Sequence, residues 1–289
     1  MYTGEVSIQC SSCRKRDAVF KRRTSGEKLC RLCLYSSIVK QIRKALHYYK
    51  MIKKNSNAAF LIMANKPLLS LAALSVYESA VRDFNIDITV LCFDKYTDCG
   101  KISSSIKASN HKLIEVKDRF IARNFIEWLK YGEYMAVKIA RESNIEFIAV
   151  PLYRDELSIL SLFGLLTASR TIFSEGLPIR EVNDIKITRP FYYVVSNDMT
   201  YLASTSKSIM EIDLNEHKFE EETNFFKHAK AILQNSPELM YSSSKSAELL
   251  QSYIFGRSKK CRYCGSYDVS DICSYCERIR KHVDDEEIS

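Results

Sequence analysis

Eight of the ten cysteines in this sequence stand in four Cys-x-x-Cys pairs, two pairs near the start and two near the end. Such a turn brings two thiolates together, and two turns joined by a short loop provide the four ligands of a tetrahedral Zn²⁺ site. Disulfides or redox-active pairs are the alternative, but disulfides need an oxidising compartment, and the first ten residues lack the apolar stretch of a secretory signal. We therefore expect two structural zinc sites, formed by Cys10, Cys13, Cys30 and Cys33 and by Cys261, Cys264, Cys273 and Cys276.

The two remaining cysteines do not predict catalysis. Cys92 lies within an apolar run, where a free thiol behaves as a small hydrophobic side chain. Cys99 lies in a predicted loop near the expected ligand face, but the sequence offers no neighbour that would lower its pKa. The five histidines form no spaced cluster either.

Positive charge is concentrated at the N-terminal end. The net charge of the chain is +8, yet residues 1–54 alone carry 14 basic and three acidic side chains. Such clustering is typical of proteins that bind a polyphosphate. The alternative is that these side chains form an ordinary solvent-exposed helix face with no binding role. We expect RNA binding by the cations of this module and of the helix that follows it: Arg14, Lys15, Arg16, Lys21, Arg22, Arg23, Lys40, Arg43 and Lys44.

Between the cysteine modules, apolar strand patterns alternate with helical ones, which predicts an α/β core with a parallel sheet. Strands are expected over 58–63, 86–93, 112–116, 145–150 and 185–195, and helices over 34–52, 67–83, 121–143 and 155–168, with a further helix starting at 197–204. The predicted divisions are a zinc module (1–34), a basic linking helix (35–54), the core (55–210), a helical connection (211–256), a second zinc module (257–283) and an acidic tail (284–289). No apolar run is long enough for a membrane span, so we expect a cytoplasmic protein.

Ligands of parallel sheets bind at the carboxyl ends of the strands, which directs attention to the turn after Met63. A loop that cradles phosphate needs glycines, and this turn has none. Lys66 is its only cation, and Pro67 removes one backbone N–H group. We expect no tight binding of ATP there.

Several stretches together carry a family resemblance: Thr24-Ser25-Gly26-Glu27-Lys28-Leu29-Cys30, Tyr153-Arg154-Asp155-Glu156, Arg189-Pro190-Phe191 and Cys261-Arg262-Tyr263-Cys264-Gly265. In order and spacing the chain resembles the tRNA 2-thiolation proteins of the TtuA type, which are related to the eukaryotic cytoplasmic tRNA 2-thiolation subunits. The resemblance implies a PP-loop ATP pyrophosphatase core (adenine nucleotide alpha hydrolase-like) flanked by two zinc modules. It also implies a vestigial nucleotide site at Lys66, Asp94 and Asp155.

The chain departs from that family where the chemistry would occur. The family's Ser-Gly-Gly-Lys-Asp-Ser loop would fall on residues 63–69, which keep neither glycine nor serine. Trp128 and Tyr131 stand where the family has two thiols, and no cysteine occurs between Cys99 and Cys261, so no Fe–S cluster is expected.

The resemblance and its gaps lead to one preferred function and two alternatives. We expect a catalytically degenerate tRNA 2-thiolation protein, most simply not an enzyme, that binds tRNA. Its partner would be an active PP-loop paralogue in a heterodimer, or a second copy in a homodimer. The alternatives are an enzyme with an altered site for ATP or sulfur transfer, and a zinc-dependent RNA-binding protein outside thiolation.

Overall fold

The computed structural model describes residues 8–107, 111–117, 120–219 and 224–284 and is built around one six-stranded sheet. The strand order is β5-β4-β3-β6-β8-β7, and all neighbours are parallel except β7, which runs antiparallel to β8. The prediction of an α/β core with a mainly parallel sheet is confirmed. The strands are β3 (Asn57–Leu61), β4 (Asp87–Phe93), β5 (Lys112–Val116), β6 (Phe147–Ala149), β7 (Ile179–Val182) and β8 (Ile185–Thr188).

Helices cover both faces of this sheet, as two adjacent residues of β3 demonstrate. The ring of Phe60 lies 5.6 Å from that of Tyr77 on α2 (Pro67–Val81). Leu61 points to the opposite face, where it contacts α4 (Phe125–Glu142). Its side chain comes so close to Gly132 of this helix that a Cβ at that position would lie 3.5 Å away. The central strand is therefore buried on both sides, which explains its uninterrupted apolar sequence.

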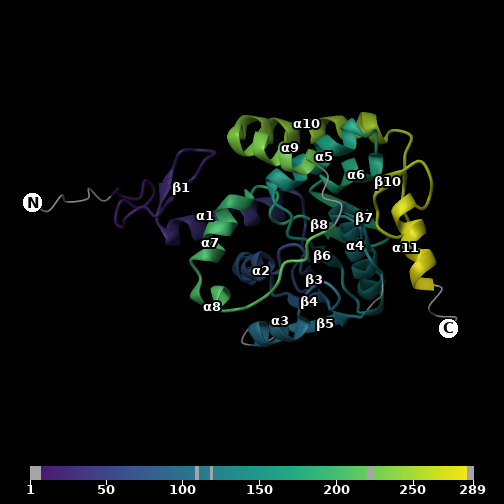
Figure 1. Ribbon diagram of the computed structural model, residues 1–289, viewed down its shortest axis with the longest axis horizontal. Helices are drawn as coiled ribbons and strands as arrows, with labels where there is room; N and C mark the ends of the chain where they lie inside the picture. The colour runs from purple at the N-terminus through teal and green to yellow at the C-terminus, as the bar shows by residue number, and fades with distance from the viewer. Residues whose placement is uncertain (1–7, 108–110, 118–119, 220–223, 285–289) are drawn as a thin grey trace, which may run out of the picture.

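The two cysteine modules lie at opposite ends of the molecule (Figure 1). The N-terminal module contains β1 (Phe20–Lys21) and β2 (Lys28–Leu29) and leads into α1 (Arg31–Tyr48). The C-terminal module contains β9 (Lys259–Lys260), β10 (Tyr267–Asp268) and α11 (Ser274–Asp284). Both modules are thus built on a short antiparallel ribbon followed by a helix.

The remaining helices connect or cover these parts: η1 (Arg82–Phe84), α3 (Cys99–Ile106), α5 (Arg154–Leu166), α6 (Arg170–Glu175), α7 (Ser196–Ser204), α8 (Lys207–Met210), α9 (Asn224–Asn235) and α10 (Pro237–Phe255). Helices α9 and α10 pack over α5 at the top of Figure 1. In the described part of the chain, no helix combines the length and apolar character that a membrane crossing needs.

Two local predictions were wrong. The strand expected over 185–195 ends at Thr188, because Pro190 has no N–H group to donate to a strand neighbour and Arg189 turns into a buried ion-pair cluster. Its antiparallel partner, β7, was not predicted from the sequence. The turn that joins β7 to β8 contains Asn183, which has a left-handed φ of 53° that asparagine tolerates, and an asparagine there is a signal of a hairpin turn. Cys99 was expected in a loop and instead begins α3, capped by the Asp98 side chain.

Candidate metal centres and the strand-end site

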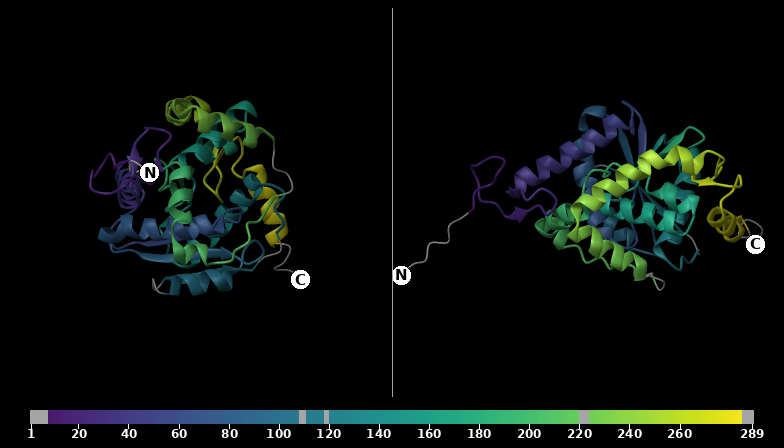
Figure 2. Two further views of the ribbon diagram at one scale, coloured as in Figure 1. Left: turned by 60° about the vertical axis from the view of Figure 1, so that its left-hand side comes forward. Right: turned by 90° about the horizontal axis from the view of Figure 1, so that it is seen from above.

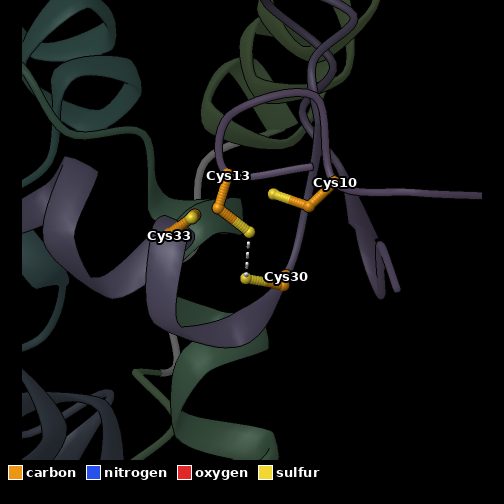
Figure 3. Close-up of side chains that lie close together, drawn as sticks. All are labelled: Cys10, Cys13, Cys30 and Cys33. Carbon is orange, nitrogen blue, oxygen red and sulfur yellow. Dashed lines mark hydrogen bonds between the residues drawn. The ribbon is translucent and has the colours of Figure 1, made fainter. Parts of the chain in front are cut away.

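The four N-terminal cysteines converge on one point (Figure 3), with their sulfur atoms within 4.8 Å of one another. Cys10 begins a tight turn, in which its carbonyl accepts from the N–H of Arg14 at 2.9 Å and Arg14 takes a left-handed φ of 54°. Cys30 immediately precedes α1, and the backbone N–H of Cys33 and the nearby guanidinium of Arg16 lower the pKa of its thiol. These contacts favour the thiolate form of Cys30, which is the form that binds metal.

The four C-terminal cysteines form a second group with the same spread, and all four are buried. Gly265 in this module adopts a φ of +67° and presses against β7, where a Cβ would lie 2.6 Å from the carbonyl oxygen of Glu181. Only glycine fits both the turn and this close approach. The module is therefore docked on the sheet edge by its metal-binding turn.

Beneath this second group lies a buried cluster of charged residues that sequence reasoning missed: Lys130, Glu133, Glu175, Arg180 and Arg189. Arg180 bonds to Glu133 at 2.6 Å and to Glu175 at 2.7 Å. Lys130 donates to Glu175 at 2.7 Å and to the sulfur of Cys264 at 3.0 Å. Three cations face two carboxylates, so the cluster holds one positive charge in excess next to the thiolates. The sequence holds one local sign of this cluster: Lys130 and Glu133 lie three positions apart, on the face of the amphipathic helix α4 that is expected to be buried.

At the centre of the sheet, the strand order reverses between β3 and β6, and the loops that follow these two strands meet. There Lys66 pairs with Glu156 at 2.6 Å and lies 4.6 Å from the ring centre of Tyr153. Burial lowers the pKa of Lys66, while the charge of Glu156 opposes this. Glu156 was not among the predicted site residues, although its neighbour Asp155 was, and the sequence does not show which of two adjacent carboxylates faces Lys66 across 90 positions.

The three residues predicted as a vestigial nucleotide site do not form one group. Asp155 is buried and accepts from the backbone N–H of Ser196 at 2.9 Å and from its hydroxyl, so it caps α7. Asp94 is exposed after β4, and within the described residues it joins neither Lys66 nor Asp155 through a hydrogen bond or ion pair.

A cavity of about 680 Å³ opens beside the Lys66–Glu156 pair. It is bounded by the loops at the strand ends, by α5, α6 and α9, and by Ser274 and Tyr275 of the C-terminal module. Its wall is mainly apolar, with Phe125, Ile159 and Phe163 among the contributing side chains. Its polar groups include Glu156 and the amide of Asn65, whose buried oxygen has no hydrogen-bond partner in the described structure.

The positions of the two expected family thiols are filled by aromatic packing. Trp128 and Tyr131 are fully buried on α4. The ring of Phe93 meets both of them edge-on, and Phe120 stacks on Tyr131 at 4.7 Å. These two side chains therefore belong to the core between α4 and the sheet.

Most of the cations predicted to bind RNA are exposed, with one exception. Arg14, Lys15 and Arg16 lie at the surface, as do Lys21, Arg23, Lys40, Arg43 and Lys44. Arg22 is buried at 6% exposure and bonds to Asp198 at 2.7 Å and to Glu27 at 2.9 Å. It joins the N-terminal module to α7, so its assignment to an RNA surface was wrong.

The expectation that Cys92 is a free thiol within the core was also wrong. Cys92 and Cys99 form a disulfide between the end of β4 and the start of α3, with their Cα atoms 5.8 Å apart. The sequence separation of seven residues gave no sign of this, because the turn after Phe93 brings the two side chains together. Cys99 therefore has a partner, which is Cys92 and not a catalytic base.

Comparison with solved structures identifies the fold. The U34-tRNA thiolase NcsA from Methanococcus maripaludis, with its [4Fe-4S] cluster, is similar over 96% of each chain with a TM-score of 0.72 and 15% sequence identity. An NAD⁺ synthetase from Burkholderia pseudomallei is more distant, with a TM-score of 0.43, 8% identity, and coverage of 78% of this chain and 90% of the other. No protein-family model matches this sequence, and neither does any curated protein.

The chain thus has the fold of a PP-loop tRNA thiolase, as the resemblance implied, and two Cys₄ groups that could bind metal. The expectation that no Fe–S cluster belongs here is not supported by this comparison, because the similar thiolase contains one.

Proposed function

We propose that this chain is a tRNA-binding protein of the thiolase fold that does not activate tRNA itself and acts beside a catalytically active thiolase subunit. The resemblance to a U34-tRNA thiolase extends along almost the whole chain, which supports a role in the same modification. The role is that of a partner, in a heterodimer with the active subunit or in a homodimer.

The observation that carries this proposal is the turn between β3 and α2. Phosphate binding at such a turn needs free backbone N–H groups. Here the N–H of Met63 donates to the hydroxyl of Ser70 at 3.0 Å, and the N–H of Lys66 donates to the carbonyl of Met63 at 3.2 Å. Pro67 has no N–H, and Glu156 neutralises the Lys66 ammonium. Two backbone donors of the turn are thus engaged, a third is missing at Pro67, and the one lysine is paired with a carboxylate, which leaves the turn poorly equipped to hold a triphosphate.

We propose that each Cys₄ group binds one Zn²⁺ ion, whose chemistry is to hold its module folded. Four sulfurs around one zinc, each about 2.3 Å from it, lie ~3.8 Å apart. The separations of 3.9 Å between Cys13 and Cys30 and of 3.8 Å between Cys264 and Cys273 fit that spacing. In a cubane cluster each thiolate binds a different iron, so the sulfurs stand further apart.

The proposed tRNA surface is the N-terminal module with α1. This module, which carries the exposed cations, lies at one end of the long axis of the protein (Figure 1). An extended row of cations releases counterions when it binds a polyphosphate, which is the main source of affinity for nucleic acid.

The cavity at the strand ends favours one second candidate, an enzyme with an altered site. A volume of about 680 Å³ lined by Asn65 and Glu156 has room for a small molecule at the place where PP-loop proteins carry out chemistry. Titration of the purified chain with ATP and with AMP separates the two candidates. We expect no heat of binding for either nucleotide, and micromolar binding would favour the enzyme.

The deciding experiment is mass spectrometry of tRNA nucleosides from cells that lack this chain, compared with the parent and with cells in which the gene is restored. We expect loss of one 2-thiouridine derivative and its recovery on restoration. If thiolation is unchanged, the chain works outside that pathway, as an RNA-binding protein stabilised by zinc.

A further inference from the structure

A cluster of tyrosines lies where the end of α1, the turn after β8 and α10 meet. Tyr49 and Tyr192 form its base, and both hydroxyls donate to the carboxylate of Glu248, at 2.7 Å and 2.9 Å. Above this base, Tyr48 and Tyr241 are 63% and 60% exposed, and Tyr193 is half-buried. We call Tyr48, Tyr193 and Tyr241 the tyrosine patch. Its rings are held by a hydrogen-bonded base and remain accessible to solvent.

Arg154, the first residue of α5, lies between two rings of the patch. Its guanidinium carbon is 5.3 Å from the ring centre of Tyr193 and 5.7 Å from that of Tyr241. Burial lowers its pKa, and the groups that oppose this effect are tyrosines. Among the described residues it forms no ion pair, and its Nε is buried without a hydrogen-bond partner. The charge is partly desolvated and has no anion beside it.

Arg154 is half-buried, and the fully buried arginines of this chain have partners that it lacks. Arg22 meets Asp198, and Arg180 and Arg189 both meet Glu133 and Glu175. A buried cation without a counter-charge is costly, so an unpaired one at a surface is best explained by an anion that arrives with a ligand. Glu248, the carboxylate at the base of the patch, is already engaged by Tyr49, Tyr192 and Lys245.

The surface around the patch extends this positive character. Lys44 lies 4.9 Å from the ring centre of Tyr193, and Lys40, Lys44 and Tyr48 follow one another at four-residue intervals on one exposed face of α1. Helices α1 and α10 are both visible on the face shown at the right of Figure 2. Helix α1 is about 27 Å long and leads from the N-terminal cysteine module to the patch, so the cations on its exposed face form a row between the two.

We infer that the tyrosine patch and Arg154 bind an unpaired nucleotide of RNA, with its base stacked on a tyrosine ring and its phosphate on the guanidinium. Aromatic side chains stack on any exposed base, and cations beside them hold the backbone. The row of cations along α1 favours a polynucleotide over a free nucleotide, because it offers several further phosphate contacts. This inference rests on the proposed binding of tRNA and adds the place where an unpaired base is held.

The test compares variants of the full-length, metal-loaded protein. Arg154→Gln removes the charge, Tyr241→Ala removes an exposed ring, and Tyr241→Phe keeps the ring. Matched controls are Tyr253→Ala, an 85% exposed tyrosine further along α10, and Lys207→Gln on α8, which also removes one charge. Circular dichroism confirms that each variant is folded. The probes are a fluorescein-labelled ten-nucleotide oligouridine, a blunt twelve-base-pair RNA duplex and a tRNA transcript.

We expect Arg154→Gln and Tyr241→Ala to bind the oligouridine about tenfold more weakly, and Tyr241→Phe and both controls to bind it as the wild type does. The effect on the duplex should be under threefold, because its bases are not free to stack. An oligouridine carrying 4-thiouridine should cross-link to the peptides that contain Tyr193 or Tyr241.

Three results would overturn the inference, and each can be distinguished from the others. If the wild type binds the tRNA transcript but Arg154→Gln and Tyr241→Ala bind every probe equally well, the patch is not a nucleotide site although the proposed tRNA binding stands. If the wild type binds neither tRNA nor oligouridine, both fail. Displacement of the oligouridine by polyglutamate at equal charge concentration would also count against it, because the patch would then recognise an acidic peptide.

Discussion

The ammonium group of Lys130 donates a hydrogen bond to the sulfur of Cys264 at 3.0 Å, although the two residues belong to the α/β core and to the C-terminal module. Burial alone would lower the pKa of Lys130, but the Cys264 thiolate and Glu175 raise it well above its usual value. The lysine is therefore a fixed cation beside the Cys₄ group that we propose as a metal site.

Replacing Lys130 with Met should destabilise the protein by about 3–5 kcal/mol, because the change removes the buried ammonium that faces the Cys264 sulfur and breaks one of the buried ion pairs of Glu175. Urea denaturation measures the loss. The matched control is Lys281→Met on α11, where an exposed pair with Glu277 should contribute less than about 1 kcal/mol. Equal stability of wild type and Lys130→Met would show that the buried contact has no such role.

The two metal sites should release their ions at different rates. In the N-terminal group Cys13 and Cys33 are half-buried, whereas all four C-terminal cysteines are buried. A chelator should therefore remove one equivalent of metal quickly and the second slowly, as followed with a colorimetric zinc indicator. Cys13→Ser should abolish the fast phase and leave the slow one.

Elemental analysis of the same samples decides which metal is present. We expect two zinc ions per chain and no acid-labile sulfide. Four irons with four sulfides in protein purified without oxygen would contradict the assignment of zinc to one of the sites.

Two adjacent arginines should respond in opposite ways. Arg22→Ala leaves the buried Asp198 without its partner, so the free energy of unfolding should fall by about 3 kcal/mol. Arg23→Glu changes an exposed residue, so stability should stay within about 0.5 kcal/mol while tRNA binding weakens and depends less steeply on salt. Filter binding at several salt concentrations, together with urea denaturation, measures both quantities. The proposed surface would be wrong if Arg23→Glu, alone and combined with Lys44→Glu, bound tRNA unchanged.

The disulfide between Cys92 and Cys99 makes stability depend on redox conditions. Closing this short loop should add about 2 kcal/mol under oxidising conditions. The midpoint of urea denaturation should fall when a reductant is added, and the Cys92→Ala, Cys99→Ala double variant should not respond. If the reductant lowered the midpoint of this double variant by the same amount, the effect would come from the other cysteines, in the two Cys₄ groups, and not from the disulfide.

The sequence by itself determined the features that depend on local spacing. Two cysteine pairs across a short loop define a metal site wherever the module lies, because the ligands come from adjacent turns. The apolar patterns were enough to predict the strands at 58–63, 86–93 and 112–116 to within two residues at each end. In the central strand β3, burial on both faces leaves an almost uninterrupted apolar run, whereas the edge strand β5 carries exposed Lys112 and Glu115. The excess of N-terminal charge was equally visible.

Only the tertiary structure decided what each charged or reactive side chain does. Arg22 and Arg23 look alike in sequence, but α7 brings Asp198 to one of them and leaves the other in water. Glu156 reaches Lys66, and Cys264 reaches Lys130, across 90 and 134 positions of the chain. The physical reason is that the fate of a charge depends on its desolvation and on the nearest opposite charge. Both are set by which elements pack together, and no local pattern records that.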